Sequence, residues 1–86
     1  MFVLWSKPAC VQCNAAKRWF AKNGAAYVEK QILDDLDKLR EFQEMGIMQA
    51  PIIEAPGVGT FSGFRPDLLE KSLEYLKENP DGDRDA

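Results

Sequence analysis

Residues 1–13 read Met1-Phe2-Val3-Leu4-Trp5-Ser6-Lys7-Pro8-Ala9-Cys10-Val11-Gln12-Cys13, and this stretch decides the fold. Its opening residues are almost all apolar, which is typical of a central strand buried on both faces. A helical pattern of apolar and basic residues follows over residues 11–23 and ends at Asn23-Gly24. The two cysteines are therefore expected at a strand-to-helix turn.

Cys10 and Cys13 are the only cysteines of the chain. Residues three apart at a helix start lie on one face, about 5–6 Å apart, within reach of a disulfide. The free N–H groups and the positive end of the helix dipole favour a thiolate at Cys10, and the thiolate is the attacking species in thiol–disulfide exchange. Cys13, about one turn further in, is expected to be less exposed. We predict that Cys10 is the nucleophile and Cys13 the resolving thiol.

The composition describes one small domain of acidic character. The chain has 86 residues, 45% of them hydrophobic, and a formal net charge of −3. We expect one domain over residues 1–78 and a disordered acidic tail over residues 79–86, which has almost nothing apolar to bury. Scattered basic residues argue against nucleic-acid binding, and no apolar run approaches the roughly 18–20 residues of a membrane span. We therefore expect a soluble, cytoplasmic monomer.

The rest of the chain alternates between strand and helix signals. We expect a second strand at 25–30, a helix from Asp34-Asp35 to Gly46, a strand at 50–55, a turn at 56–59, a strand from Thr60-Phe61 and a last helix at 65–78. The helix after Asp35 has apolar residues every three positions, namely Leu36, Leu39, Phe42 and Met45, and the last helix points Leu69, Leu73 and Leu76 inward with Leu68 beside them. The predicted fold class is α/β, in the order β-α-β-α-β-β-α, with a central four-stranded mixed sheet and three helices. This order is the layout of the thioredoxin superfamily and resembles the small glutaredoxins.

Three segments are informative together: Lys7–Cys13, Gln49-Ala50-Pro51 and Phe61-Ser62-Gly63-Phe64-Arg65-Pro66-Asp67. In that order they resemble the redox motif, the cis-proline loop and the Trp-Ser-Gly-Phe-Arg-Pro segment of the NrdH-redoxins, a glutaredoxin-like family. Phe61 stands where the family carries tryptophan. An aromatic ring is kept there, but an indole N–H is lost.

The resemblance implies a thiol–disulfide oxidoreductase that acts as a protein electron carrier. Its expected partners are class Ib ribonucleotide reductase, other protein disulfides and thioredoxin reductase, which holds the FAD and uses the NADPH, so that this chain binds no cofactor and no metal. Poor glutathione binding is expected, because Ser62–Pro66 replaces the glycine-rich acidic segment that holds the tripeptide in other glutaredoxins. Pro51, if cis, would place its loop against the dithiol and leave backbone groups free for an extended substrate segment. The expected contacts with substrate or partner are Lys7, Val11, Gln12, Ala50, Pro51, Ser62, Gly63, Phe64 and Arg65.

Several of these residues also have plainer interpretations. Lys7 is either a solvated lysine or a cation that stabilises the Cys10 thiolate. Gln12 is either an exposed helix residue or a contact that selects partners. Arg65 at a helix start is electrostatically misplaced, which favours a specific partner, an acid or a backbone carbonyl. Gly63 marks either close backbone approach or a positive φ. The remaining interpretations are structural: Trp5, Trp19 and Phe20 as core, Asp67 as a first-turn acid, and Asp34, Asp35, Asp37, Glu41 and Glu44 as solvated surface.

The cysteine pair admits other functions. A structural zinc site needs four ligands, and a chain without histidine or a third cysteine could supply them only across a dimer, as could a bridged iron–sulfur cluster. An inert buried pair is disfavoured by the helix-start position. The alternatives kept open are a glutathione-dependent glutaredoxin, a regulatory module whose Cys10–Cys13 pair switches its binding, and an arsenate-reductase-like protein, which fits less well because those chains are longer.

Overall fold

The computed structural model describes residues 1–79, and the elements follow the predicted order. They are β1 (Phe2–Ser6), α1 (Val11–Lys22), β2 (Tyr27–Gln31), α2 (Leu36–Glu44), β3 (Ile52–Ala55), β4 (Gly59–Ser62) and α3 (Pro66–Glu78), with a short 3-10 helix at Ile32–Asp34 before α2. Asn79 is the C-cap of α3. The rest of the predicted tail, residues 80–86, lies outside the described residues.

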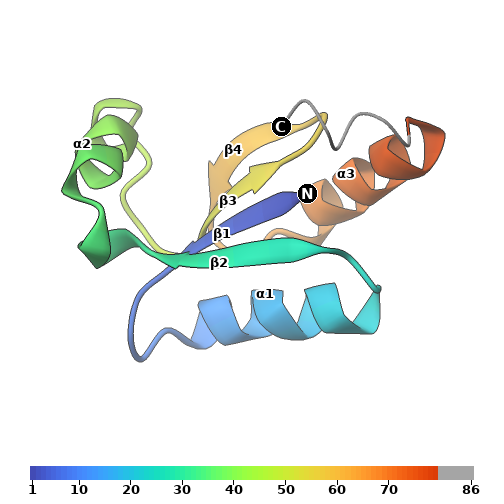
Figure 1. Cartoon of the computed structure of the whole chain (residues 1–86), viewed down its shortest axis with the longest axis horizontal. Helices are drawn as coiled ribbons and strands as arrows, with labels where there is room; N and C mark the ends of the chain where they lie inside the picture. The colour runs from blue at the N-terminus through green and yellow to red at the C-terminus, as the bar shows by residue number, and fades with distance from the viewer. Residues whose placement is uncertain (80–86) are drawn as a thin grey trace.

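The sheet has four strands in the order β2-β1-β3-β4 (Figure 1). β1 pairs with β2 in parallel and with β3 antiparallel, and β3 and β4 form an antiparallel hairpin. The parallel pair is joined through α1, as expected for a crossover connection. The predicted fold class and the internal position of β1 are confirmed.

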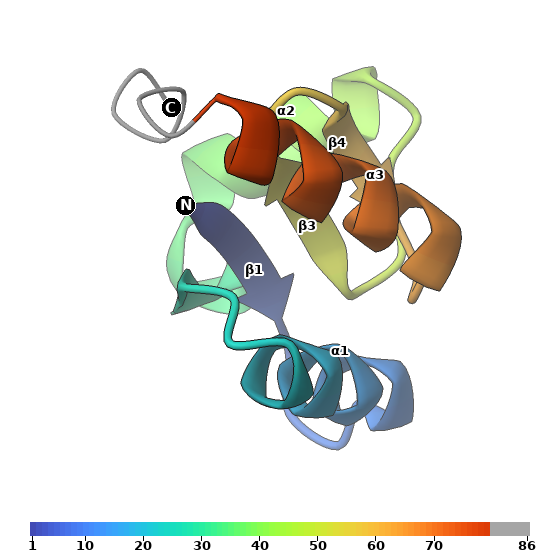
Figure 2. The same cartoon turned by 90° about the vertical axis from the view of Figure 1, so that its right-hand side faces the viewer.

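The sheet separates two apolar clusters. Phe2 and Leu4 of β1 pack with Phe20 of α1 and Leu69 of α3, whereas Trp5 faces the other side and packs with Phe42 of α2. This alternation follows from the two-residue period of a strand. In Figure 2, α1 and α3 accordingly lie toward the viewer and α2 lies behind.

The three aromatic residues predicted as core are core residues. Trp5 and Phe20 are buried, and Trp19 packs partly buried against the first cluster. The ring of Phe20 lies between those of Phe2 and Tyr27, at centroid distances of 5.0 and 4.6 Å. Trp5 meets the ring of Phe42 edge-on at 5.8 Å.

Only part of the apolar row of α2 packs against the sheet. Leu39 and Phe42 pack against the second cluster, but Leu36 and Met45 are 67% and 54% exposed. A step of three residues turns an α-helix by about 300°, so a row of four such positions drifts across half of the helix surface. Only the middle of the row can face the sheet, so the residues at its two ends lie toward solvent.

Local capping explains where α2 begins. The Asp35 carboxylate accepts the Lys38 backbone N–H at 3.0 Å, which makes Asp35 the N-cap. Asp34, predicted to open this helix, ends the preceding 3-10 turn instead. The sequence signal for an N-cap was therefore correct at one of the two adjacent aspartates.

Two other elements begin later than predicted. Tyr27 opens β2, because the Ala25 N–H donates to the Phe20 carbonyl and Ala25 still belongs to the turn that leaves α1. Ile52 opens β3, because Pro51 has no N–H for the sheet ladder.

The inward face of α3 contains a residue that periodicity did not predict. Leu69 is buried and Leu76 packs against the first cluster, as predicted, but Leu73 is only partly buried. Ser72 is buried instead, and its hydroxyl donates to the Pro56 carbonyl at 2.6 Å. A polar side chain thus fixes α3 to the turn between β3 and β4.

Candidate active site at the start of α1

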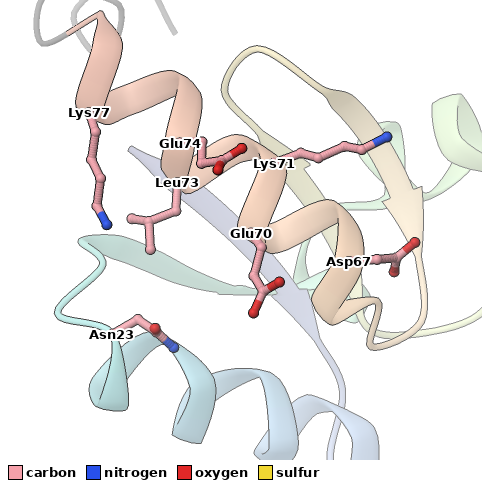
Figure 3. Close-up of a pocket in the computed structure, with 7 residues that line it drawn as sticks. All are labelled: Asn23, Asp67, Glu70, Lys71, Leu73, Glu74 and Lys77. Carbon is pink, nitrogen blue, oxygen red and sulfur yellow. The ribbon is translucent and has the colours of Figure 1, made fainter.

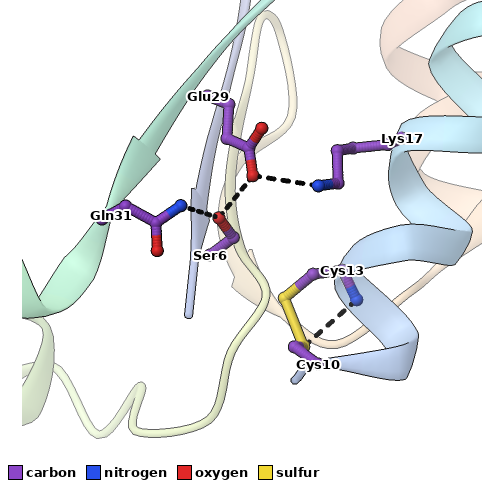
Figure 4. A network of polar contacts seen from close by, with 6 residues as sticks. All are labelled: Ser6, Cys10, Cys13, Lys17, Glu29 and Gln31. Carbon is purple, nitrogen blue, oxygen red and sulfur yellow. Dashed lines mark hydrogen bonds and ion pairs between the residues drawn. A yellow bond between two sulfur atoms is a disulfide. The ribbon is translucent and has the colours of Figure 1, made fainter. Parts of the chain in front are cut away.

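Cys10 and Cys13 form a disulfide at the N-terminus of α1 (Figure 4). Cys10 is the N-cap residue with an extended backbone, and the Cα atoms are 5.2 Å apart. The Cys10 Sγ accepts the Cys13 backbone N–H at 3.2 Å. This N–H is one of the free donors of the first helical turn, so it stabilises negative charge on Cys10 once the disulfide is opened.

The two cysteines differ in access. Cys10 is 9% exposed and Cys13 is 2% exposed, so Cys10 is the more accessible residue of the pair. Val11, next to Cys10, is 79% exposed and presents an apolar side chain beside it. This difference favours thiol–disulfide exchange with an outside partner at Cys10. Cys13 is placed to react with Cys10 alone.

Gln12 joins the redox motif to the loop before α3. Its Oε1 accepts the Phe64 backbone N–H at 3.1 Å. One residue earlier, the Gly63 N–H donates to the Pro51 carbonyl at 2.8 Å. The three segments that carried the family resemblance thus meet in one place.

The proline loop and the residues opposite it complete this cluster. The Ala50–Pro51 peptide bond is cis, Pro51 is buried and Ala50 is half-buried. Ser62 ends β4 opposite Ile52 in the strand register. Gly63 has a φ of +84°, while a Cβ there would meet Gln12 Oε1 only at 3.5 Å. Backbone conformation, more than close approach, therefore demands the glycine.

Arg65 has the specific acidic partner that its position suggested. Its guanidinium donates to both carboxylate oxygens of Asp67, at 3.2 and 3.0 Å. These bonds lower the pKa of Asp67 and raise the pKa of Arg65. Asp67 lies in the first turn of α3, as predicted, and is also this partner. Both side chains are exposed.

The side chains of Lys7 and Phe61 make no polar contact in this cluster of described residues. Lys7 is exposed and makes no hydrogen bond or ion pair with the described residues 1–79. Phe61 packs partly buried against the first apolar cluster. An aromatic ring fills that position without needing a polar atom, which accounts for the tolerated replacement of tryptophan.

A polar network beside α1 was not predicted from the sequence (Figure 4). The buried Ser6 hydroxyl donates to Glu29 Oε2 at 2.7 Å, and Gln31 Nε2 donates to Ser6 Oγ at 3.0 Å. Lys17, one turn after Cys13, pairs with the same Glu29 oxygen at 3.2 Å. The Ser6 hydrogen bond first and Lys17 second lower the pKa of Glu29 against an opposing effect of burial. The available signal was a polar residue, Ser6, at the end of an otherwise apolar strand.

A surface hollow of about 480 Å³ lies away from this motif, between the end of α1 and α3 (Figure 3). Its lining combines acids and lysines with one leucine and contains neither cysteine: Asn23, Asp67, Glu70, Lys71, Leu73, Glu74 and Lys77. Across residues 1–79, no group of three or more His, Cys, Asp or Glu side chains could hold a metal ion. No helix in the same range is long and apolar enough to cross a membrane.

The fold and the dithiol define a class of protein, the glutaredoxin-like dithiol proteins of thioredoxin fold. A glutaredoxin family model matches residues 2–59. The glutaredoxin-like protein NrdH of Lactococcus lactis is 35% identical over 71 residues, which are 83% of this chain and 97% of that protein. The chain belongs to the glutaredoxin family and, within it, to the NrdH-type glutaredoxin-like redox proteins.

Two further similarities extend this result. The solved structure of NrdH-redoxin from Escherichia coli, described as having a thioredoxin-like activity profile, superposes with a TM-score of 0.75 at 27% identity, covering 81% of this chain and 91% of that one. The global transcriptional regulator Spx of Listeria innocua is 26% identical across 93% of this chain and 66% of its own length.

Proposed function

We propose that this protein is a dithiol electron carrier that reduces the disulfide of class Ib ribonucleotide reductase and is itself reduced by thioredoxin reductase. The observation that carries the proposal is the contact between two NrdH-type segments, in which Gln12 of the redox motif binds the Phe64 N–H. The sequence similarity to the Lactococcus NrdH protein supports it. In this proposal the protein acts as a cytoplasmic monomer, and the flavin and NADPH belong to the reductase.

The proposed reaction begins with the reduced dithiol. The Cys10 thiolate attacks one sulfur of the substrate disulfide, that bond breaks, and the departing substrate thiolate takes up a proton. The Cys13 thiolate then attacks Cys10 Sγ, which releases the second substrate sulfur as a thiolate and forms the Cys10–Cys13 disulfide. Two electrons have passed to the substrate, and the reductase returns two electrons to the carrier.

Recharging the oxidised protein with two purified systems tests this function. NADPH with thioredoxin reductase should reduce it rapidly, and glutathione with NADPH and glutathione reductase should reduce it slowly. The reduced protein should then support turnover of a class Ib ribonucleotide reductase. Faster recharging by glutathione would instead make the protein an ordinary glutaredoxin.

The similarity to Spx favours a second candidate, a regulatory module whose disulfide controls partner binding. In that case Cys13→Ser should leave partner binding intact, and the wild type should show no multiple-turnover electron transfer. Pull-down of partners with the wild type and the variant, together with the recharging assay, separates the two functions. Sustained turnover by the wild type would argue against the regulatory module.

A further inference from the structure

The loop entering α3 offers backbone N–H groups close to the redox motif. A helix N-terminus and its free N–H groups attract carboxylates. Small thiols of the glutathione type carry carboxylates that could bind there and bring their sulfur to the disulfide. Whether this loop can accept such a ligand depends on what its donors already bind.

The donors of this loop are bound within the protein. The Gly63 N–H donates to the Pro51 carbonyl and the Phe64 N–H to Gln12 Oε1. Pro66 has no N–H. The Leu68 N–H at the start of α3 donates to the Arg65 carbonyl at 3.1 Å. The protein's own acceptors occupy positions that a ligand carboxylate would need.

The local cation is also engaged. Arg65 holds both carboxylate oxygens of Asp67 and is therefore already paired. Of these internal acceptors, Gln12 is the one supplied by the redox motif itself, and its side chain is exposed. Backbone carbonyls cannot be removed by substitution, but the Gln12 amide can.

We propose that Gln12 is a specificity-determining residue whose side-chain carbonyl acts as an internal ligand for the Phe64 N–H and closes this position to carboxylate-bearing thiols such as glutathione. The inference rests on the proposed function, since it supplies a reason for recharging by a protein reductase rather than by glutathione. The resemblance attributes poor glutathione binding to the whole Ser62–Pro66 segment, whereas this inference attributes it to the Gln12 side chain.

The reaction that Gln12 disfavours consumes two glutathione molecules. The first glutathione thiolate attacks one sulfur of the Cys10–Cys13 disulfide, which gives a mixed disulfide and releases the other cysteine as a thiolate. The second attacks the glutathione sulfur of that mixed disulfide, so oxidised glutathione leaves and the protein gains two electrons. A carboxylate bound at the Phe64 N–H would hold the first glutathione in place for attack.

Reduction by glutathione should be compared with reduction by 2-mercaptoethanol, a neutral monothiol without a carboxylate. A change in the general reactivity of the disulfide alters both rate constants equally and cancels in their ratio. Gln12→Ala should raise this ratio roughly tenfold, the gain expected from a hydrogen bond to a charged group. Gln12→Glu keeps an acceptor for the Phe64 N–H and should not raise the ratio. The matched control is Gln43→Ala, which removes an exposed amide from α2.

An NMR titration gives a second readout that does not depend on turnover. With unreactive S-methylglutathione, the Phe64 amide resonance should move in Gln12→Ala but remain fixed in the wild type and in Gln43→Ala. An unchanged rate ratio together with an unmoved Phe64 resonance in Gln12→Ala would overturn the role of Gln12 and leave the proposed function standing. Rapid recharging of the wild type by glutathione would overturn the proposed function itself.

Discussion

At the scale of single residues, the disulfide is asymmetric. Cys10 caps α1 and is the more exposed residue, while Cys13 lies within the first turn of the helix and is buried. A partner can reach Cys10, and the Cys13 backbone N–H is a donor for the Cys10 thiolate. The nearest disulfide partner of Cys13 is Cys10 itself. This difference predicts that both serine variants lose turnover but that only one of them traps a mixed disulfide.

Cys10→Ser should lower multiple-turnover disulfide reduction by a factor on the order of 10³ or more, because the attacking thiolate is lost. Cys13→Ser should also stop turnover but still attack, so that a mixed disulfide with the substrate accumulates. Mass spectrometry of the trapped species provides the measurement. Activity that survives in Cys10→Ser would contradict the assignment of the nucleophile.

Glu29 makes a pH-dependent contribution to stability. Its pKa is lower in the folded protein than in the unfolded chain, chiefly because the Ser6 hydroxyl donates to its carboxylate. The stabilisation is therefore complete above the unfolded pKa, near 4.3 for a free Glu, and disappears as the pH falls through the folded pKa. At neutral pH it should amount to about 0.2–1 kcal/mol, as for other solvent-accessible pairs.

Urea unfolding of the wild type and Glu29→Gln over pH 3–7 tests this contribution. The difference in unfolding free energy should favour the wild type at neutral pH and shrink toward the acid end. Glu44→Gln on the exposed surface of α2 is the control and should show no such trend. A Glu29→Gln difference that stays constant with pH would rule out the linkage.

At the scale of elements, α3 is held against the turn between β3 and β4. Ser72 bonds the Pro56 carbonyl, and a Cβ at Gly57 would overlap the ring of Tyr75. The φ of Gly57 is +77°, and that of Gly46 after α2 is +78°, but Gly46 has open space around it. These two glycines share a backbone conformation and differ in crowding.

Gly57→Ala should therefore destabilise the protein more than Gly46→Ala. The shared left-handed conformation should cost about 1–2 kcal/mol in both variants. Crowding against Tyr75 should add roughly 1–3 kcal/mol at Gly57 alone. Thermal or urea unfolding measures the difference, and repeating it in a Tyr75→Ala background should remove the excess. Equal losses in the two glycine variants would refute the close packing of α3 on this turn.

The sequence predicted the elements well because their signals are local. The apolar run of β1, the cap at Asp35 and the positive-φ glycine after α1 each act within a few residues. The orientation of α2 was less predictable, since a period of three only approximates the helical repeat. Ser72 was missed because a buried serine depends on a tertiary partner, the Pro56 carbonyl, which local sequence does not reveal.

The candidate site was predictable in its segments but not in its contacts. The resemblance to the NrdH-redoxins identified the Gln12 and Phe64 segments, yet nothing in their sequences joins the Gln12 amide to the Phe64 N–H. The Ser6–Glu29 bond likewise requires the parallel register of β1 and β2. Such contacts form only once distant segments have been brought together by folding.

At the scale of the whole molecule, β1 divides two cores of unequal size. The larger contains residues from α1 and α3, and the smaller depends on Phe42 of α2 together with Trp5, Ile32 and Ile52. α2 is thus attached by few side chains. The smaller core should be the more sensitive to a single truncation.

Phe42→Ala should cost about 3–5 kcal/mol, because it removes the aromatic side chain that fills the smaller core. Leu36→Ala, at an exposed position of the same helix, should change stability by no more than about 0.5 kcal/mol. Urea unfolding monitored by tryptophan fluorescence provides the comparison. If Phe42→Ala does not fold, Phe42→Leu should show a smaller loss in the same direction. A loss from Leu36→Ala that matched Phe42→Ala would show that α2 packs differently.

The Gln12–Phe64 hydrogen bond joins residues 52 positions apart. The redox motif therefore depends on a contact from a distant segment and cannot be transferred alone to another protein. If the two residues between Cys10 and Cys13 are replaced by those of another protein, the new residues lack the loop that they contacted in that protein. The Phe64 N–H of this protein then loses the Gln12 carbonyl as its acceptor. Designers who exchange such tetrapeptides to adjust a redox potential would also alter a distant backbone donor, so the Gln12 position and the Phe64 loop should be exchanged as a unit.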